Sequence, residues 1–355
     1  MEVKMDNLIM NDTGMKAEGG VAQRLMQNGM NVNSLRPWVG KDGRAYMTVN
    51  DGNSPHTIVV NSATLRRLEW EQYDQAIIKE VQQRLVGIAD LQSRGLVYNI
   101  ANGLGKTILT SENINTYLTA ELSMDGLSNT KTDRPVYGAD YLPLPLIHCD
   151  YTINARNLAE SRNTGDSIDT TNAQMAARAV AEKMETILFT GTSSYKYGSG
   201  TIYGYLDFPY INEVTLDAHW DASGVTGANM LADLLAMKQA LITDGFYGPY
   251  VVYIPTAYET VLDNDFKSEG TLTIRQRLLQ ISSITDIKVV DKLTADHVIM
   301  VQMTSDVVRL VNGMEITPVE WQEQGGMVLH YKVMGIKVPQ IRCTQGQHCG
   351  IAVLS

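Results

Sequence analysis

The clearest hydrophobic pattern in the chain runs from Leu65 to about Ser93. Apolar side chains recur there every three or four residues, at Trp70, Tyr73, Ile77, Val81, Leu85, Ile88 and Leu91. This spacing places them on one face of an α-helix, with most charged residues on the opposite face. We therefore expect a single amphipathic helix, about 40 Å long at roughly 1.5 Å per residue. Gly95 is its predicted stop.

Residues 1–64, ahead of this helix, show no sustained periodicity. Short apolar pieces such as AYMTV and HTIVV are strand candidates, and Gly, Asn and Asp separate them. The segment has too little apolar patterning to pack by itself. We interpret it as an extended arm whose structure depends on neighbours, and a small irregular subdomain is the alternative.

Residues 96–145 alternate short apolar pieces with Asn, Gly, Thr and Pro. This texture is typical of a long two-stranded excursion with a mobile tip. A structureless connection of such length is uncommon inside a compact domain. We therefore expect an arm that becomes ordered by contacting another chain.

A second helix is predicted from about residue 170 to Gly191, with Asp169 and Thr170 as candidate N-caps. Its apolar stripe consists of Ala173, Ala177, Val180, Met184, Ile187 and Leu188. The order then runs from strand-like LIHCDYTINARNLAESRN through this helix to the turn YGYLDFP.

Residues 226–314 alternate helical and strand-like segments, which predicts an α/β lobe. A helix from Met230 to Thr243 is expected to bury Leu231, Leu234, Leu235, Leu241 and Ile242. YVVYIP is interpreted as a buried strand, TAYETVLDNDF and TIRQRLLQI as helices, and IKVVDKL, VIMVQM and VVRLV as strands. The last forty residues read as strands, and MVLHYKVMGIKVPQIR is expected to return to the first lobe.

Composition describes an ordinary folded protein, with 44% hydrophobic and 19% charged residues among 355. No run approaches the roughly 18 apolar residues of a membrane span. The N-terminus lacks a basic region followed by an apolar core, so no secretory signal is expected. The net charge of −10 argues against a protein that grips nucleic acid through a basic face.

The cysteines are Cys149, Cys343 and Cys349, an odd number that cannot all pair within one chain. This count fits a reducing compartment. Cys343, His348 and Cys349 together suggest zinc, but a fourth ligand and CxxC-type spacing are missing. We therefore interpret them as near-terminal strand residues.

Enzyme motifs are weak. The segment Asn102-Gly-Leu-Gly-Lys-Thr107 resembles the end of a phosphate-binding loop, but Ile100 stands where that loop requires glycine. The six histidines are scattered and form no HExxH pair. We expect no enzyme activity, no catalytic residues, no cofactor and no metal.

The order of elements resembles the HK97-type capsid fold of tailed bacteriophages, which encapsulins share. The resemblance is carried by LEWEQYDQAIIKEVQQRL, LIHCDYTINARNLAESRN, AARAVAEKMETILFTG, YGYLDFP and MKQALITDGFYGPYVVYIPTAYETVL. It covers about residues 65–355 and is finest with the encapsulin-like branch. It implies an α+β fold with an N-arm, an E-loop, a P-domain with a long spine helix, and an A-domain.

On this resemblance, each domain can be given a residue range. The expected ranges are an N-terminal arm at 1–64, an amphipathic helix at 65–95, an E-loop at 96–145, a P-domain at 146–225 and 315–355, and an A-domain at 226–314. The spine helix would span about 170–190. Encapsulins begin close to the amphipathic helix, whereas this chain has about 64 residues ahead of it. The resemblance therefore implies a major capsid protein of a tailed bacteriophage, and an encapsulin shell enclosing a cargo enzyme is the alternative.

The implied function is self-assembly. Hexamers and pentamers would form an icosahedral head that encloses double-stranded DNA without sequence-specific binding. Portal, scaffold and decoration proteins are further candidate partners. The protein would be made in the host cytoplasm and reside in the virion, without membrane contact. No covalent cross-link through Lys106 or Lys131 is expected.

The expected assembly contacts lie on the amphipathic helix and the E-loop. They are Trp70, Tyr73, Ile77, Val81, Tyr98, Lys106, Tyr117, Leu118, Arg134 and Tyr137.

Overall fold

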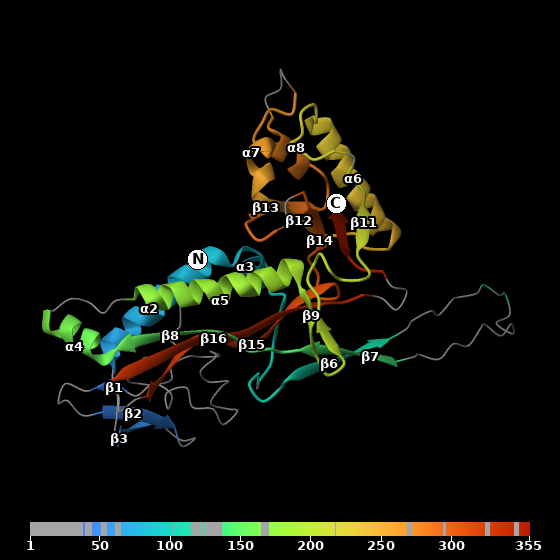
Figure 1. The fold of residues 1–355 in the computed structure, drawn as a ribbon. Coiled ribbons are helices and arrows are strands. Elements are labelled where there is room, and N and C mark those ends of the chain that lie inside the picture. Colours follow the sequence, from blue (N-terminus) through green and yellow to red (C-terminus); the bar gives the residue numbers. More distant parts are fainter. Residues whose placement is uncertain are drawn as a thin grey trace. The chain divides into compact units, whose positions relative to one another are not determined.

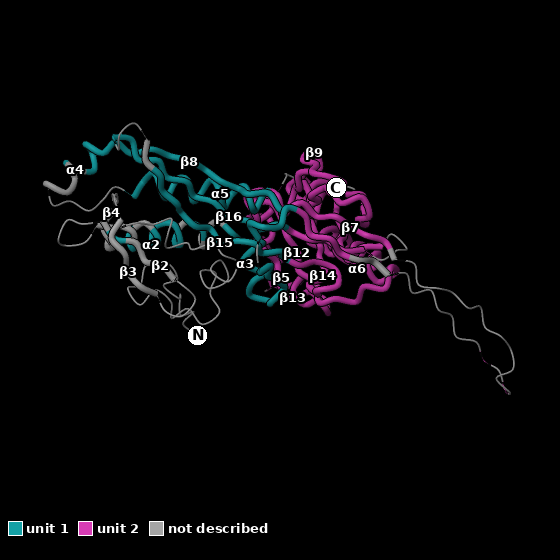
Figure 2. The backbone as a smooth tube through the Cα atoms, turned by 90° about the horizontal axis from the view of Figure 1, so that it is seen from below, with its two compact units in different colours: residues 1–107, 144–186, 310–338 teal, residues 108–143, 187–309, 339–355 magenta. Residues whose placement is uncertain are grey.

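The computed structural model describes residues 38–39, 45–50, 55–60, 65–101, 103–114, 122, 124, 137–164, 170–216, 218–267, 272–293, 296–323, 327–343 and 348–355. The chain forms two compact units, each assembled from segments that are far apart in the sequence (Figure 2). Unit 1 consists of residues 1–107, 144–186 and 310–338, and unit 2 consists of residues 108–143, 187–309 and 339–355.

Unit 1 begins with a small sheet in the order β3-β2-β1-β4. Its strands are β1 (Trp38–Val39), β2 (Ala45–Asn50), β3 (Pro55–Val60) and β4 (Leu65–Arg66). β2 and β3 are antiparallel and coincide with the pieces AYMTV and HTIVV. Both strand predictions are therefore confirmed.

The single long helix expected over residues 65–93 is wrong in one respect, because the structure contains two helices. They are α2 (Arg67–Arg84) and α3 (Val86–Ser93). Leu85 separates them, with φ of −96° and ψ of 72°, which is not helical. The break gives α3 its own N-terminus, whose N–H groups bind a carboxylate described below.

The stop at Gly95 is confirmed. Gly95 has a φ of +72° and donates its N–H to the Gln92 carbonyl, while Leu96 donates to the Leu91 carbonyl. This pair of bonds is a Schellman motif, in which the left-handed residue is usually glycine.

The main sheet of unit 1 has the order β5-β15-β16-β8. Its strands are β5 (Val97–Asn99), β15 (Val308–Glu323), β16 (Val328–Ile341) and β8 (Ile147–Asn154). β16 runs antiparallel to β8, from Val328 opposite Asn154 to Gly335 opposite Ile147. The long returning strand predicted near the C-terminus is therefore confirmed as β16.

The predicted spine helix is confirmed as α5 (Thr171–Thr190), which follows the shorter α4 (Ala155–Thr164). Every member of its predicted apolar stripe is buried. Figure 1 shows α5 lying along the main sheet. Gly335 of β16 permits this packing, because a Cβ there would come within 2.7 Å of the Met184 side chain.

Unit 2 is built around a five-stranded sheet in the order β11-β17-β14-β12-β13. Its strands are β11 (Asn212–Val214), β17 (Ile351–Leu354), β14 (Val298–Gln302), β12 (Tyr250–Pro255) and β13 (Ile284–Val290). All residues of β12 are buried, as predicted for YVVYIP. The accompanying helices are α6 (Gly227–Thr243), η2 (Thr256–Tyr258), α7 (Glu259–Leu262) and α8 (Ile274–Leu279).

One expectation for these elements needs correction. In α6, Leu234 and Leu241 are buried as predicted, but Leu235 is exposed, and Met230 and Met237 are buried in addition. Near the C-terminus, β17 pairs with β14 and β11 in unit 2. Its four buried residues make it an interior strand there. The division into arm, E-loop, P-domain and A-domain stays a prediction.

Unit 2 also contains two hairpins. β6 (Ile108–Ile114) pairs antiparallel with β7 (Tyr137–Pro143), and β9 (Thr192–Tyr197) pairs antiparallel with β10 (Gly200–Ile202). The strands of the predicted excursion are confirmed as β6 and β7. Of the connection between them, the structure describes only Leu122 and Met124.

Candidate functional site

The two hairpins of unit 2 pack directly on each other, and we call their four strands the hairpin base. Gly200 of β10 makes the approach possible. A Cβ on Gly200 would come within 2.6 Å of the Tyr141 carbonyl oxygen and 2.7 Å of Pro143 in β7. Glycine in a strand commonly marks such a close approach between backbones.

Side-chain hydrogen bonds anchor the hairpin base to the end of β16. Gln340, which is buried, donates from Nε2 to Ser111 Oγ of β6 at 2.9 Å. Its Oε1 accepts from Arg309 Nε at 2.6 Å. A buried side-chain amide whose oxygen and nitrogen both form hydrogen bonds holds its bonding partners in place. The root of the β6–β7 hairpin is therefore held rigidly to unit 2.

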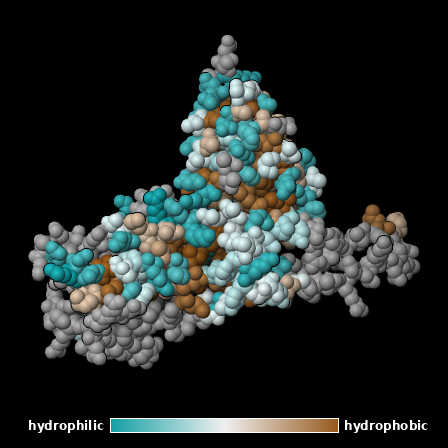
Figure 3. All heavy atoms as spheres, in the orientation of Figure 1, coloured by the Kyte–Doolittle hydropathy of each residue, from teal (hydrophilic) through white to brown (hydrophobic). Residues whose placement is uncertain are grey.

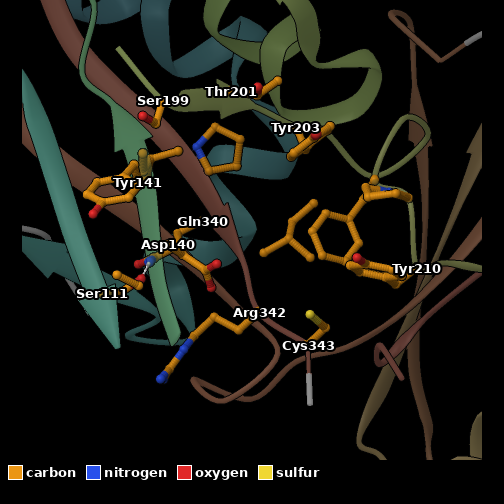
Figure 4. Close-up of a pocket in the computed structure, with 16 residues that line it drawn as sticks. Ser111, Asp140, Tyr141, Ser199, Thr201, Tyr203, Tyr210, Gln340, Arg342 and Cys343 are labelled. Carbon is orange, nitrogen blue, oxygen red and sulfur yellow. Dashed lines mark hydrogen bonds between the residues drawn. The ribbon is translucent and has the colours of Figure 1, made fainter. Parts of the chain in front are cut away.

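A pocket of about 290 Å³ lies beside the hairpin base (Figure 4). Asp140, Tyr203, Tyr210, Arg342 and Cys343 are among its lining residues. Burial raises the pKa of the Cys343 thiol, and the nearby Asp140 carboxylate raises it further. A thiol with a raised pKa is a poor nucleophile, and no histidine lines the pocket. The arrangement favours a contact surface over a catalytic centre.

Exposed tyrosines gather on the hairpin base. Tyr197 is the register partner of Gly200, and Gly200 lies against the backbone carbonyl of Tyr141, so the backbones of these two exposed tyrosines meet at the same glycine. Tyr195 is also exposed and lies two residues from Tyr197 in β9. Tyrosine is enriched at protein interfaces because it combines apolar area with a polar tip. We call Tyr141, Tyr195 and Tyr197 the tyrosine patch.

The connection between β6 and β7 carries the most exposed apolar side chains among the described residues. Leu122 and Met124 have relative exposures of 106% and 107%. On the face drawn in Figure 3, hydrophobic and hydrophilic residues are otherwise interspersed. Complete exposure of two neighbouring apolar side chains suits a segment that is covered in an assembly.

A buried carboxylate joins α3 to α5 within unit 1. Glu185, which is 2% exposed, accepts from the Gly87 N–H through Oε1 at 2.6 Å and from the Ile88 N–H through Oε2 at 3.4 Å. A negative charge at a helix N-terminus is stabilising because it satisfies free N–H groups and complements the helix dipole. Sequence reasoning missed this residue, although a glutamate beside an apolar stripe is a visible sign.

The predicted contact residues of the amphipathic helix have mixed positions. Ile77 is 2% exposed and packs inside its own chain, whereas Val81 is half-buried. Trp70 and Tyr73 belong to α2, but their side chains lie outside the described part of the structure.

The predicted contact residues of the E-loop are spread along the segment. Tyr98 is exposed on β5, and Lys106 is exposed just before β6. Tyr137 is the first residue of β7, and its side chain is not described. The remaining three lie outside the described residues: Tyr117, Leu118 and Arg134. Their role as contacts stays a prediction.

The segment ending at Thr107, which resembles part of a phosphate-binding loop, is not followed by a helix. Residues 103–107 form turns that run directly into β6, so they lack the helix N-terminus of a phosphate-binding loop. Gly103 instead permits close packing, because a Cβ there would overlap the Gly313 backbone. Among the described residues, no group of three or more His, Cys, Asp and Glu side chains can hold a metal. No described helix is long and apolar enough to cross a membrane.

Solved structures with a similar fold are shell proteins. A virus-like particle from Pyrococcus furiosus aligns with a TM-score of 0.58 at 19% identity, covering 81% of this chain and 99% of that chain. The capsid of the Myoviridae phage XM1 aligns with a TM-score of 0.59 at 12% identity, covering 76% and 91%. The capsid of a native GTA particle aligns with a TM-score of 0.54 at 12% identity, covering 75% and 89%. The predicted α+β fold of the HK97 type is therefore confirmed.

No curated protein sequence matches this chain. Residues 60–344 match a family described as "Family of unknown function (DUF6260)". Because this match spans well over half of the chain, the protein belongs to the DUF6260 family.

Proposed function

We propose that this protein is the major capsid protein of a tailed bacteriophage, which self-assembles into the icosahedral shell of the head. The observation that carries the proposal is the β6–β7 hairpin, whose connection exposes Leu122 and Met124 completely, in a fold shared with shell proteins. Burying such side chains against another subunit contributes about 25 cal/mol per Å² of apolar area. The role is structural and involves no catalysis.

In the proposed shell, each subunit contacts one neighbour through one surface and is contacted by another neighbour through a different surface. The β6–β7 connection of one subunit would lie over its neighbour, and the tyrosine patch would support the contact near the hairpin root. Heterologous contacts of this kind close into rings when the angle between subunits allows it. Rings of five and six would then join through many individually weak contacts, which gain strength by multivalency.

The phage assignment is preferred to an encapsulin because of the additional N-terminal segment. The family match begins at residue 60, and the alignment with the Pyrococcus furiosus particle uses nearly all of that chain but 81% of this one. An added arm suits a shell whose subunits are tied together, as in a phage head. The N-arm, E-loop, P-domain and A-domain would have the boundaries expected from the sequence.

The proposed content of the shell is double-stranded DNA, enclosed without sequence-specific binding. A net charge of −10 is compatible with enclosure, because a container needs little affinity for its content. The protein would be made in the host cytoplasm and reside in the virion. Portal, scaffold and decoration proteins are the further partners proposed.

Assembly can be tested with matched variants. We expect the purified chain, expressed alone or with the scaffold and portal proteins of its own genome neighbourhood, to form closed shells by negative-stain electron microscopy. Leu122→Gln combined with Met124→Gln should leave small rings or single subunits with an unchanged melting temperature, because both side chains are fully exposed. Met175→Gln, at an exposed site on α5, is the control and should assemble normally.

Two outcomes would contradict the proposal. One is a chain that stays monomeric or dimeric even with its scaffold and portal proteins. The other is a Leu122/Met124 double variant that assembles as well as the control. Nuclease-protected DNA inside particles isolated from the host would support the phage assignment, and a co-purified protein cargo without DNA would overturn it.

A further inference from the structure

We infer that Cys343 and Cys349 of unit 2 form an intrachain disulfide when the protein meets an oxidising environment. The two residues lie directly opposite each other in an antiparallel β-bridge. Opposed residues in antiparallel pairs have Cα atoms about 4.5 or 5.5 Å apart. Disulfides span Cα separations of about 4.4–6.8 Å, so the separation expected for either kind of pair falls within the range that a disulfide spans.

The Cys349 thiol lies close to the backbone beside Cys343. Cys349 Sγ lies 3.8 Å from the carbonyl oxygen of Arg342, the residue directly before Cys343. Both cysteines are free thiols in the structure. His348 does not complete a metal site with them, because no three His, Cys, Asp or Glu side chains among the described residues come together to hold a metal, and its Nδ1 lies 2.9 Å from Asp244 Oδ1. The geometry therefore favours a thiol pair over the zinc site that the sequence suggested.

The two thiols differ in access, which sets the order of reaction. Cys349 is fully buried, and burial raises its pKa to about 12. Cys343 is half-buried and lines the pocket beside the hairpin base, where a small oxidant can reach it (Figure 4). Because the thiolate is the reacting form, both cysteines are slow near neutral pH. They would remain reduced during synthesis in the cytoplasm.

The proposed oxidant is a small-molecule disulfide such as oxidised glutathione. The Cys343 thiolate attacks one sulfur of this disulfide, and one small thiol leaves. The Cys349 thiolate then attacks the Cys343 sulfur, and the second small thiol leaves. Two electrons and two protons thus pass from the cysteines to the oxidant, and one protein S–S bond replaces its S–S bond.

The bond would fasten the C-terminal strand of the protein. It would tie Cys349, just ahead of β17, to Cys343, just after β16, and β17 is an interior strand of the unit 2 sheet. The closed ring would include His348, which pairs with Asp244 at the C-terminal end of α6. The inference goes beyond the proposed function, since it concerns unit 2 whether or not shells form.

Thiol counting tests the inference on the full chain. The native protein is incubated with oxidised glutathione at mildly alkaline pH, then unfolded in guanidinium with a maleimide and weighed as an intact chain. We expect one maleimide per chain instead of three, because only Cys149 stays free. Without oxidant, all three cysteines should be labelled. The unlabelled pair should map to one peptide linkage between Cys343 and Cys349.

Two cysteine variants show which residues form the bond. Cys149→Ser should still lose two thiols on oxidation, whereas Cys343→Ser should form no intrachain bond and should retain Cys149 and Cys349 as free thiols. Because Cys343 is only half-buried, its serine variant is better tolerated than one at buried Cys349. Three labelled cysteines after oxidation, a glutathione adduct on Cys343 without ring closure, or a bond between chains would each overturn the inference. Electron microscopy of the same samples reports shell formation separately.

Discussion

Two buried or partly buried carboxylates show how single residues organise this chain. Glu185 accepts from two N–H groups at the start of α3. Asp207, in the turn after β10, accepts from the Gly204 N–H at 2.5 Å. Each satisfies backbone donors that would otherwise be buried without partners, at a desolvation cost.

Replacing Glu185 with glutamine should destabilise unit 1. The amide oxygen can accept from one N–H, but the amide NH₂ would face the second donor, so one buried N–H loses its partner. We expect a loss of about 1–3 kcal/mol in the free energy of unfolding. Glu182→Gln is the control, because its bond with Arg178 is exposed and worth about 0.2–1 kcal/mol. Equal losses in urea titrations of the two variants would contradict this role for Glu185.

The carboxyl group of Asp207 should make the stability of unit 2 depend on pH. Burial raises the pKa of its carboxyl group, and hydrogen bonds from Gly204 and Ser193 oppose the shift without cancelling it. A raised pKa in the folded state means that this group's contribution to stability falls as pH rises from the unfolded pKa of 3.8 through the folded value. Asp207→Asn removes the charge and keeps an acceptor oxygen.

The variant should therefore gain melting temperature relative to the wild type at neutral pH, and the gain should shrink near pH 4. Asp306→Asn, at an exposed position, should show no such trend. A difference between Asp207→Asn and the wild type that is constant across this pH range would contradict the assignment.

Helix ends are the features of individual elements that the sequence predicts best. Gly95 and Gly191 were expected to end helices, and both have a left-handed φ, of +72° and +73°. Their surroundings differ, because a Cβ on Gly95 meets nothing within 4 Å, whereas a Cβ on Gly191 would overlap the Asp207 carboxylate. The left-handed conformation could be predicted from the sequence, but the overlap depends on Asp207, which lies beyond the β9–β10 hairpin.

This contrast predicts unequal costs for two alanine substitutions. Gly95→Ala should cost about 1–2 kcal/mol, the strain of a left-handed residue with a Cβ. Gly191→Ala should cost about 1–3 kcal/mol more, because the Asp207 carboxylate is held by the Gly204 N–H and cannot easily move aside. Denaturant unfolding measures both. If the excess for Gly191→Ala persisted in an Asp207→Ala background, the overlap would not be its cause.

Other details of the elements were not predictable from periodicity. A 3.6-residue pattern continues through Leu85, so the break between α2 and α3 could not be seen without knowing that Glu185 binds the N-terminus of α3. In α6, Leu235 and Met237 have similar apolar character, and only the tertiary packing decides that Met237 is buried and Leu235 exposed. The partners of β17 could not be predicted either, because a short apolar strand carries no information about which strands it pairs with.

For the whole molecule, the order of elements was enough to predict the fold, while the site depends on distant pairs. Gln340 of β16 reaches Ser111 of β6 across 229 residues. No local pattern indicates the tyrosine patch, because Tyr141 lies in β7 whereas Tyr195 and Tyr197 lie in β9, much further along the chain. Ile77, which was expected at an interface, is buried within its own chain because α2 also packs inward.

The central claim is that the connection between β6 and β7 joins one subunit to the next in a closed shell. The most direct test is a cryo-electron microscopy map of the particles at side-chain detail. The account predicts an icosahedral shell in which Leu122 and Met124 of each subunit are buried against a neighbour. A closed shell with both side chains still exposed to solvent, or particles that are only discrete small oligomers, would contradict it.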